Sequence, residues 1–372
     1  MSAKYPKPFD LKALKVYPLA SRKSMSQVEN ILVEPSEEPS KISEDLQKSI
    51  RLCATQIRSA IQRASGVMLI YGAHLIKNGG QLLLNRFLEH GWITHLATNG
   101  AGIIHDWEFA FLGRSTESVR DNVATGSFGT WDETGRYIHL ALLMGGPAGE
   151  GFGRSLGRFI NQDGAVFPKA EELEESLRRE PGHPLAAARA DLLRAMREHA
   201  IPAGPMIVLH RWRNACVLAQ AFRQDVPLTV HPGIGYDIIS NHPMFNGAVL
   251  GRAAEIDFKL FCASVETLDN GVVMSVGSAI MGPQVFEKSI SCVNNLRLQA
   301  KREIVEGHSI FVVDLQDGGN WDWTKGEPPK DNAAYYLRFC KSFSRMGGTM
   351  HYLQCDNVAF LHHLYHALQK GA

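Results

Sequence analysis

Short apolar runs bounded by glycine or small polar residues recur from residue 66 to the end of the chain, and amphipathic stretches separate most of them. The first run, GVMLIYGA, starts at residue 66, and the helical pattern NGGQLLLNRFLEHG follows it. Strands and helices alternating at this spacing are typical of a parallel sheet. We therefore predict an α/β fold, a mostly parallel sheet with helices on both faces. Seven buried strands are expected, at about 66–73, 92–102, 205–210, 227–233, 271–279, 309–319 and 349–357.

Residues 1–42 have a different pattern, polar and interrupted by prolines. We interpret them as an N-terminal arm that is either disordered or packed on another subunit. Ser43 is expected to cap a helix that starts at Glu44, and an α/β domain would then fill residues 43–372. Within it, residues of about 145–200 are first glycine-rich and then charged and helical. They predict a helical insertion, which is either a surface excursion or a lid or subunit contact.

Composition and charge narrow the class of protein. The 372 residues are 45% apolar and 21% charged, which excludes wholesale disorder. A net charge of +1 argues against a general nucleic-acid binder. The six cysteines show no CxxC spacing, so neither a disulfide scaffold nor a zinc or other metal site is expected. With no signal-peptide pattern and no apolar window of membrane-spanning length, we expect a cytoplasmic protein without a membrane partner.

Polar or glycine residues follow five of the predicted strands. Ligands of open α/β sheets bind at the carboxyl ends of the strands. Glycine there lets a ligand approach the backbone, the following helix N-terminus suits phosphate, and an acidic residue can bind ribose hydroxyls. The alternative at the first two strand ends is a pair of tight turns, since neither matches GxGxxG. The candidate cofactor-binding residues are Asn78, Gly79, Thr98, Asn99, Gly100, Ala101, Gly102, Gly277, Ser278, Asp314, Asp317 and Asp356.

Histidines and carboxylates lie near the same strand ends. His105 and Asp106 stand near the start of one predicted helix, where Asp106 would also interact favourably with the helix dipole. Asp237 and His242 lie beside glycine turns. A histidine is the natural group for proton transfer at neutral pH, so His105 and His242 are candidate catalytic residues.

The order of these segments resembles that of the deoxyhypusine synthase family. The stretch YGAHLIKNGGQLLLNRFLEHGWITHLATNGAGIIHDWEFAFLG is similar to its NAD-binding part, and GVVMSVGSAIMG, FVVDLQDGG and QCDN are similar to its later strand ends. The resemblance implies a single Rossmann-like domain that binds NAD and assembles as a homo-oligomer, a dimer or tetramer. It also implies that His242, in PLTVHPGIGYDIISNHPMFNG, has the role of the family's active-site histidine.

The sequence departs from that family at the catalytic lysine. The alignment places Arg338 at the lysine and Asn332 at the glutamate that holds the amine. Arginine stays protonated and does not readily form an imine, although Lys341, one helical turn on, is a possible substitute. We therefore predict a paralogue that acts on a small metabolite by NAD-dependent hydride transfer, not a true deoxyhypusine synthase. The expected substrate-binding residues are Lys77, Asp106, Asp237, Asn332 and Arg338.

Two other functions remain open. TNGAGIIHDWE also resembles the ornithine cyclodeaminase and dihydrolase group, which implies an amino-acid substrate and an internally recycled NAD. A third possibility is a non-catalytic nucleotide-binding or assembly protein that has kept the fold and lost the lysine.

Overall fold

A computed structural model describes residues 5–370, and a six-stranded, fully parallel sheet forms its centre. The strand order is β10-β9-β8-β2-β3-β7. Starting from β2 the chain adds β3 and β7 on one side, then returns to add β8, β9 and β10 on the other, which is the Rossmann strand order. The strands are β2 (Val67–Tyr71), β3 (His95–Asn99), β7 (Leu228–His231), β8 (Val272–Val276), β9 (Ser309–Asp314) and β10 (Thr349–Gln354). The predicted α/β Rossmann-like fold is confirmed.

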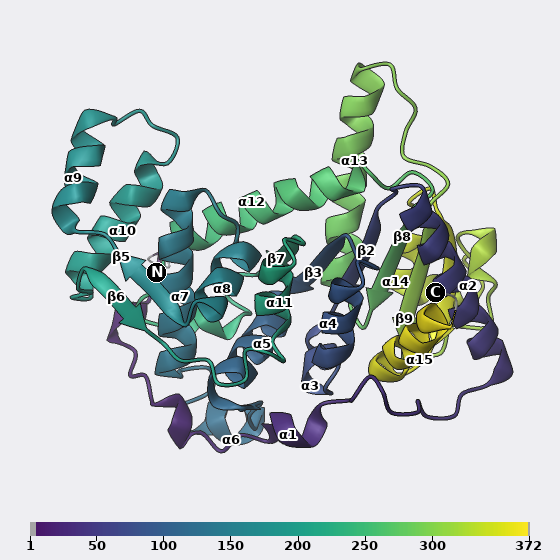
Figure 1. Cartoon of the computed structure of the whole chain (residues 1–372), viewed down its shortest axis with the longest axis horizontal. Helices are drawn as coiled ribbons and strands as arrows, with labels where there is room; N and C mark the ends of the chain where they lie inside the picture. The colour runs from purple at the N-terminus through teal and green to yellow at the C-terminus, as the bar shows by residue number, and fades with distance from the viewer. Residues whose placement is uncertain (1–4, 371–372) are drawn as a thin grey trace.

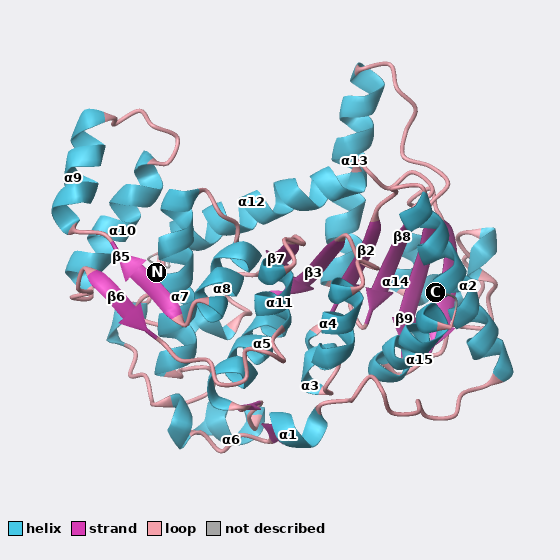
Figure 2. Cartoon of the chain, in the orientation of Figure 1, coloured by secondary structure: helices cyan, strands magenta, loops and turns pink. Residues whose placement is uncertain are grey.

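Alternating side chains divide the sheet into two packed faces. In β2, Val67, Leu69 and Tyr71 belong to the larger apolar cluster, whereas Met68 and Ile70 belong to the smaller one. Successive residues of a strand point to opposite faces, so β2 supplies both cores. Figure 2 shows helices in front of and behind the magenta strands.

Helices of both faces follow the predicted periodicity. Those in the larger core are α2 (Glu44–Gln62), α4 (Gln81–Glu89), α5 (Gly100–Leu112), α7 (Asp132–Gly145), α8 (Phe152–Asn161), α11 (Val217–Arg223) and α15 (Asn357–Gln369). Those in the smaller core are α13 (Met281–Gln299) and α14 (Arg338–Phe343), and α12 (Gly247–Val265) contributes to both cores. Ser43 caps α2 as predicted, because its hydroxyl accepts a hydrogen bond from the Leu46 amide.

One predicted strand lies outside the main sheet. Residues 205–210 were expected to be a buried strand, but β6 (Gly204–Ile207) pairs only with β5 (Gly164–Phe167), in an antiparallel ribbon. Ile207 is 75% exposed. This ribbon, α9 (Ala170–Arg179) and α10 (Ala186–Glu198) lie at the left end of Figure 1, beyond β7. The prediction of a buried sheet strand at 205–210 is therefore wrong.

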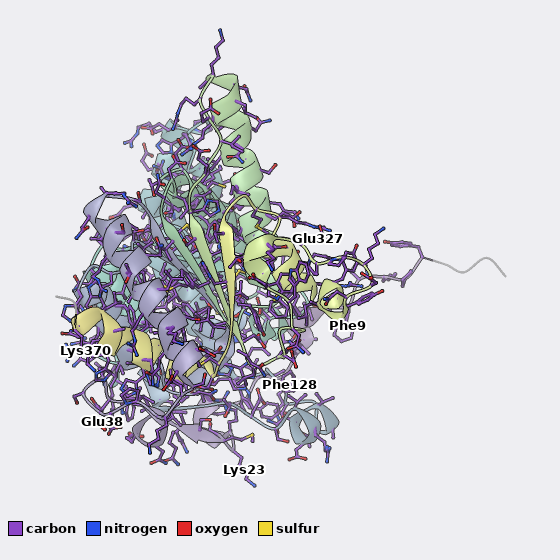
Figure 3. All side chains as sticks on the ribbon, turned by 90° about the vertical axis from the view of Figure 1, so that its right-hand side faces the viewer. Phe9, Lys23, Glu38, Phe128, Glu327 and Lys370 are labelled. Atoms are coloured by element: carbon purple, nitrogen blue, oxygen red, sulfur yellow. The ribbon has the colours of Figure 1, made fainter. Side chains whose placement is uncertain are left out.

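The N-terminal arm, described from residue 5, packs on its own chain. Its short strand β1 (Ser26–Gln27) pairs with β4 (Arg114–Ser115), and α1 (Val28–Ile31) follows directly. Figure 1 shows the purple arm running below the sheet, on the side toward which the strand arrowheads point. Lys23 and Glu38 of the arm lie at the lower edge of the molecule in Figure 3. The arm thus covers the edge at which the strands have their carboxyl ends.

Two remaining helices lie near the arm or at a strand end. They are α3 (Ala73–Lys77), directly after β2, and α6 (Val119–Ala124), after β4. No helix within residues 5–370 is long and apolar enough to cross a membrane.

Candidate functional site

A cleft with a volume of about 460 Å³ opens at the carboxyl ends of the central strands. It lies at the point where the strand order reverses, between β2 and β8, which is where open α/β sheets bind nucleotides. We call it the strand-end cleft. Six of the residues predicted to bind a cofactor line it: Asn78, Asn99, Gly277, Ser278, Asp314 and Asp356. Half of the twelve predicted cofactor-binding residues thus lie around one cavity, and their binding of a cofactor stays a prediction.

Two glycines bring β2 and β8 close together at its floor. A Cβ added to Gly72 would lie 2.0 Å from the carbonyl oxygen of Gly277. Gly277 itself has a φ of 61°, a left-handed conformation that favours glycine. The two strand ends can therefore meet this closely only if Gly72 carries no side chain, whereas a Cβ on Gly277 would collide with Asn357.

Helix α13 begins at the cleft, which Ile280 and Met281 line. Its N-cap residue, Ile280, makes no side-chain capping hydrogen bond, and no acidic residue lies in the first turn. Ser278 accepts one hydrogen bond, from the Gly282 amide at 3.1 Å. In the first turn the Gly282 amide is thus used and Pro283 has no N–H. The Met281 amide and the positive end of the dipole remain to favour an anion such as a phosphate.

Two carboxylates and one amide complete the wall. Asp314 ends β9 and accepts a hydrogen bond from the Gln316 amide at 3.1 Å. Asp356 caps α15 through the amides of Val358 and Ala359, so much of its hydrogen-bonding capacity is used. The side-chain oxygen of Asn357 is buried without a hydrogen-bond partner among the described residues. A buried polar atom of this kind usually has a partner, and a ligand in the cleft could supply one.

A second cavity, of about 240 Å³, lies beside the cleft under the arm. We call it the arm-side pocket. Lys77 lines it while the next residue, Asn78, lines the strand-end cleft. Part of its wall is apolar and is formed by Ile104, Phe128 and Ile238. Its ionisable residues are Arg22, Lys77, His105, Glu108, Glu117, Tyr236 and Asp237.

His105 is held from behind by a chain of buried groups. Its Nδ1 lies 2.7 Å from the Ser115 hydroxyl, and that hydroxyl donates to Glu108 at 2.5 Å. Glu108 in turn accepts two hydrogen bonds from the Arg22 guanidinium, at 2.8 and 2.7 Å. Burial lowers the pKa of His105 from its usual value to about 4, although Glu108 acts in the opposite direction. His105 is therefore neutral at neutral pH.

Asp237 and Lys77 put opposite charges in the same pocket. Asp237 accepts a hydrogen bond from the Gly233 amide at 2.7 Å. Burial raises its pKa to about 6. A Cβ on Gly100 would lie 2.1 Å from the Asp237 carboxylate, so this glycine allows Asp237 to approach the start of α5.

Several predicted cofactor residues support the site without lining the cleft. Thr98 donates to the Tyr71 carbonyl, and the Gly102 amide donates to Asn99. Ala101 lines the arm-side pocket. Gly79 faces the arm at Ile31. Asp317 is exposed and accepts from the Gly319 amide.

Other predicted residues lie outside both cavities. The ring of His242 packs on Gly135 and lies 3.4 Å from Asp132, and burial lowers its pKa. Asp106 is buried and caps α11 through the Val217 and Leu218 amides. Its position is explained by helix capping, although it caps a different helix from the one predicted.

The three site residues predicted near the family's catalytic lysine also lie outside the two cavities. Lys341 lies over the ring of Tyr335, 3.7 Å from its centroid. Asn332 caps a short 3₁₀ helix through the Ala334 amide, and Arg338 is the first residue of α14. None of them lines the strand-end cleft or the arm-side pocket.

Sequence reasoning missed Arg22, Glu108, Ser115 and Glu117. Glu108 could have been found from the sequence, because the otherwise apolar helix GAGIIHDWEFAFL has only three ionisable residues, His105, Asp106 and Glu108. Nothing in the sequence distinguishes Arg22, since it lies among other basic and polar residues of the arm.

No family model matches this chain, and no curated protein matches it. Among solved structures, the ternary complex of AgrE with ornithine and NAD+ aligns with 89% of this chain at 14% identity and a TM-score of 0.43. A LOR/SDH protein from Methanococcus maripaludis S2 aligns with 91% of this chain and 74% of its own, at 13% identity and a TM-score of 0.42. ArgZ, an arginine dihydrolase from the ornithine–ammonia cycle in cyanobacteria, gives a TM-score of 0.39 at 14% identity and 89% coverage of this chain.

This chain spans about a third of the length of AgrE and of ArgZ, 34% in each case. Scores at this level are too low to assign a ligand or an activity to it. The resemblance to deoxyhypusine synthase is nevertheless wrong, because no family model matches and these solved structures belong to other proteins. The glycine and acidic strand ends that suggested it are general features of a sheet with this strand order.

Proposed function

We propose that the chain binds NAD(H) in the strand-end cleft and exchanges a hydride with an amino acid or related amine in the arm-side pocket. This is the second of the functions considered from the sequence. The observation that carries it is the adjacency of the two cavities, with Lys77 in one and Asn78 in the other. A reaction between a cofactor and a substrate needs such a shared boundary, because the reacting atoms must meet.

The unit β8–α13–β9 supports the dinucleotide. The N-terminus of α13 suits a pyrophosphate, and Asp314, at the end of the neighbouring strand, suits ribose hydroxyls. A carboxylate at that position favours NAD over NADP, because it repels a 2′-phosphate. When bound, the nicotinamide would supply the hydride acceptor.

The charges of the arm-side pocket support an amino-acid substrate. Asp237 and Glu117 are suitable partners for an ammonium group, and Lys77 is suitable for a carboxylate. Ile104 and Phe128 offer contact for an aliphatic chain. A neutral His105 in the same pocket can accept the proton that leaves the amine nitrogen while the hydride leaves carbon.

Two measurements test the proposal. Titration calorimetry of the purified protein with NAD+ and NADH should show saturable binding. Incubation with amino acids, primary amines and 2-hydroxy acids should then give products by mass spectrometry, together with released ammonia where the cofactor is recycled. Failure to bind either form of the dinucleotide would refute the proposal. Binding without turnover of any amine or amino acid would favour the non-catalytic nucleotide-binding protein.

A further inference from the structure

Glu108 is a buried carboxylate whose two oxygens receive four hydrogen bonds. Arg22 donates to both oxygens, Thr134 donates to one at 2.8 Å, and Ser115 donates to the other at 2.5 Å. The side chains of Arg22 and Glu108 are 2% and 1% exposed. An ionised carboxylate only accepts hydrogen bonds, and four donors together with a buried guanidinium suit that form. The Glu108 carboxylate therefore carries a fixed negative charge on the far side of Ser115 from His105, with Arg22 as its counterion.

This charge determines where the proton of His105 lies. The single hydroxyl proton of Ser115 is directed to Glu108, so Ser115 can only accept in its 2.7 Å contact with His105. The proton in that contact must come from Nδ1 of His105. A neutral histidine carries one ring proton, and Nε2 is then left as an unprotonated acceptor. Nε2 makes no hydrogen bond to any residue from 5 to 370.

We propose that Arg22 is a positioning residue that fixes the tautomer of His105 through Glu108 and Ser115, so that the arm is part of the proton-transfer apparatus. The inference rests on the proposed function for its catalytic meaning, but the tautomer is a property of the free protein. In the reaction, a C–H bond of the substrate breaks and its hydride goes to NAD+. One N–H bond of the substrate ammonium breaks and its proton goes to Nε2 of His105, while the electron pair left on nitrogen forms the C=N bond of an iminium. His105 becomes an imidazolium hydrogen-bonded to Ser115.

The charges around His105 agree with this assignment. Lys77 and His74 approach from α3, Arg22 from the arm and Glu108 from its own helix. Glu117 and Asp237 share the pocket with the ring. The positive groups oppose protonation of the resting ring, and only Glu108, through Ser115, stabilises the imidazolium from behind. The resting histidine is thus a neutral base, ready to accept a proton.

The backbone beside Ser115 is also strained. Thr116 has a φ of 67°, which is a rare conformation for a β-branched residue. Its hydroxyl lies 3.1 Å from that of Ser26 in the arm, and its carbonyl accepts from the Met25 amide. Strain of this kind persists where the surrounding structure enforces it. Here the arm holds the turn that presents Ser115 to His105.

Removal of Arg22 should reverse the direction in which Glu108, Ser115 and His105 donate hydrogen bonds to one another. Without its guanidinium, Glu108 would be a buried charge with no counterion, which favours the protonated acid. A protonated Glu108 can donate to Ser115, and Ser115 would then donate to Nδ1 of His105. The ring proton would move to Nε2, and the base in the pocket would be lost.

Nitrogen-15 NMR of the histidine side chains tests this directly in the full-length chain, with His105 assigned by comparison with His105→Gln. The wild type should show the Nδ1–H tautomer. Arg22→Gln should show the Nε2–H tautomer, and Arg22→Lys, which keeps the charge, should retain Nδ1–H. Circular dichroism checks that each variant is folded. If Arg22→Gln does not fold, Ser115→Ala, which leaves the Arg22–Glu108 pair intact, should remove the preference for Nδ1–H. A wild-type Nε2–H tautomer, or a preference unchanged in folded Arg22→Gln or Ser115→Ala, would overturn the proposal.

Kinetics separate this inference from the proposed function. If turnover is found, Arg22→Gln should lower kcat by about 10²-fold, the lower range for loss of a general base, with little change in KM. Arg22→Lys should restore most of kcat and the wild-type pH profile. If no turnover is found, the tautomer result still stands or falls on the NMR spectrum.

Discussion

Gly79 touches the arm so closely that a Cβ added there would lie 1.7 Å from the carbonyl oxygen of Ile31. The two segments are also joined by a hydrogen bond of 3.1 Å from the Val33 amide to the Gly79 carbonyl. The arm therefore rests on the turn that follows α3. At the start of this turn, Lys77, the last residue of α3, lines one cavity and Asn78 lines the other.

Gly79→Ala should displace the arm. Its φ of 87° makes any side chain strained, and the added methyl group collides with Ile31. Trypsin should then cleave near Lys23 faster than in the wild type, and Tm should fall. Gly91→Ala is the matched control, because Gly91 has a φ of 65° but no atom within 4 Å of the added Cβ. It should lose about 1–2 kcal/mol for the left-handed backbone alone. Equal proteolysis of the two variants would contradict the close contact.

The buried pair Arg22–Glu108 should contribute strongly to stability. Arg22→Ala leaves a buried carboxylate without its partner, and losses of about 3–5 kcal/mol are typical of such changes. Chemical unfolding would measure this loss in the free energy of unfolding. The double variant Arg22→Met with Glu108→Gln should recover part of the loss, since no buried charge remains. Arg86, whose pair with Glu89 is half exposed, is the control. Arg86→Ala should change the free energy of unfolding by about 0–1 kcal/mol. A similar loss in Arg22→Ala and Arg86→Ala would show that the buried pair contributes no more than the half-exposed one.

The sequence predicted the sheet and its cleft but not the arm-side pocket. Apolar runs such as 67–71 fill a strand that is buried on both faces, and such runs are recognisable locally. The run PMIVLH is misleading because β6 belongs to a surface ribbon, where Ile207 is exposed. Arg22 and Glu108 are 86 positions apart, and no local pattern joins them. Arg338 and Lys341 were assigned from a family resemblance that is wrong, and neither lines one of the two cavities.

His95 should make the fold sensitive to acid. It is fully buried between hydroxyl groups of Ser264 and Thr229, and burial, with the nearby His231, lowers its pKa to about 3. The unfolded chain binds this proton near pH 6.5, whereas the folded chain does not. The stabilisation is therefore complete above pH 6.5 and is lost as pH falls toward 3.

The free energy of unfolding of the wild type should decrease between pH 6.5 and pH 4.5. In His95→Gln the slope of this free energy against pH should be smaller by the amount that corresponds to about one bound proton. Urea unfolding at several pH values measures both. The exposed His90 is the control, and His90→Gln should keep the wild-type slope. An unchanged slope in His95→Gln would show that His95 is not buried in its neutral form.

Lys77, and not Arg338, should recognise a carboxylate on the substrate. Lys77 lines the arm-side pocket and Arg338 lines neither cavity. Lys77→Met should raise KM for a carboxylated amine by about tenfold or more, as expected for loss of a charged hydrogen bond. The corresponding amine without a carboxylate should be little affected. Arg338→Gln should leave both KM values unchanged, and the reverse pattern would place the carboxylate elsewhere.

Asp314 should determine the choice between NAD and NADP. Its carboxylate ends β9 beside the strand-end cleft, and its one internal hydrogen bond comes from the Gln316 amide. Asp314→Ser should weaken NAD binding by about 10- to 100-fold, because a charged hydrogen bond to the ligand is worth about 1.5–3 kcal/mol. The same change should improve NADP binding relative to NAD, since a negative charge near the 2′-phosphate is removed. Asp317→Ser is the matched control, an acidic residue three positions on that caps Gly319 and lies outside the cleft. Calorimetry with both dinucleotides should show no change for this control. If Asp317→Ser alters the preference and Asp314→Ser does not, the ribose lies over the loop after β9 and not at the strand end.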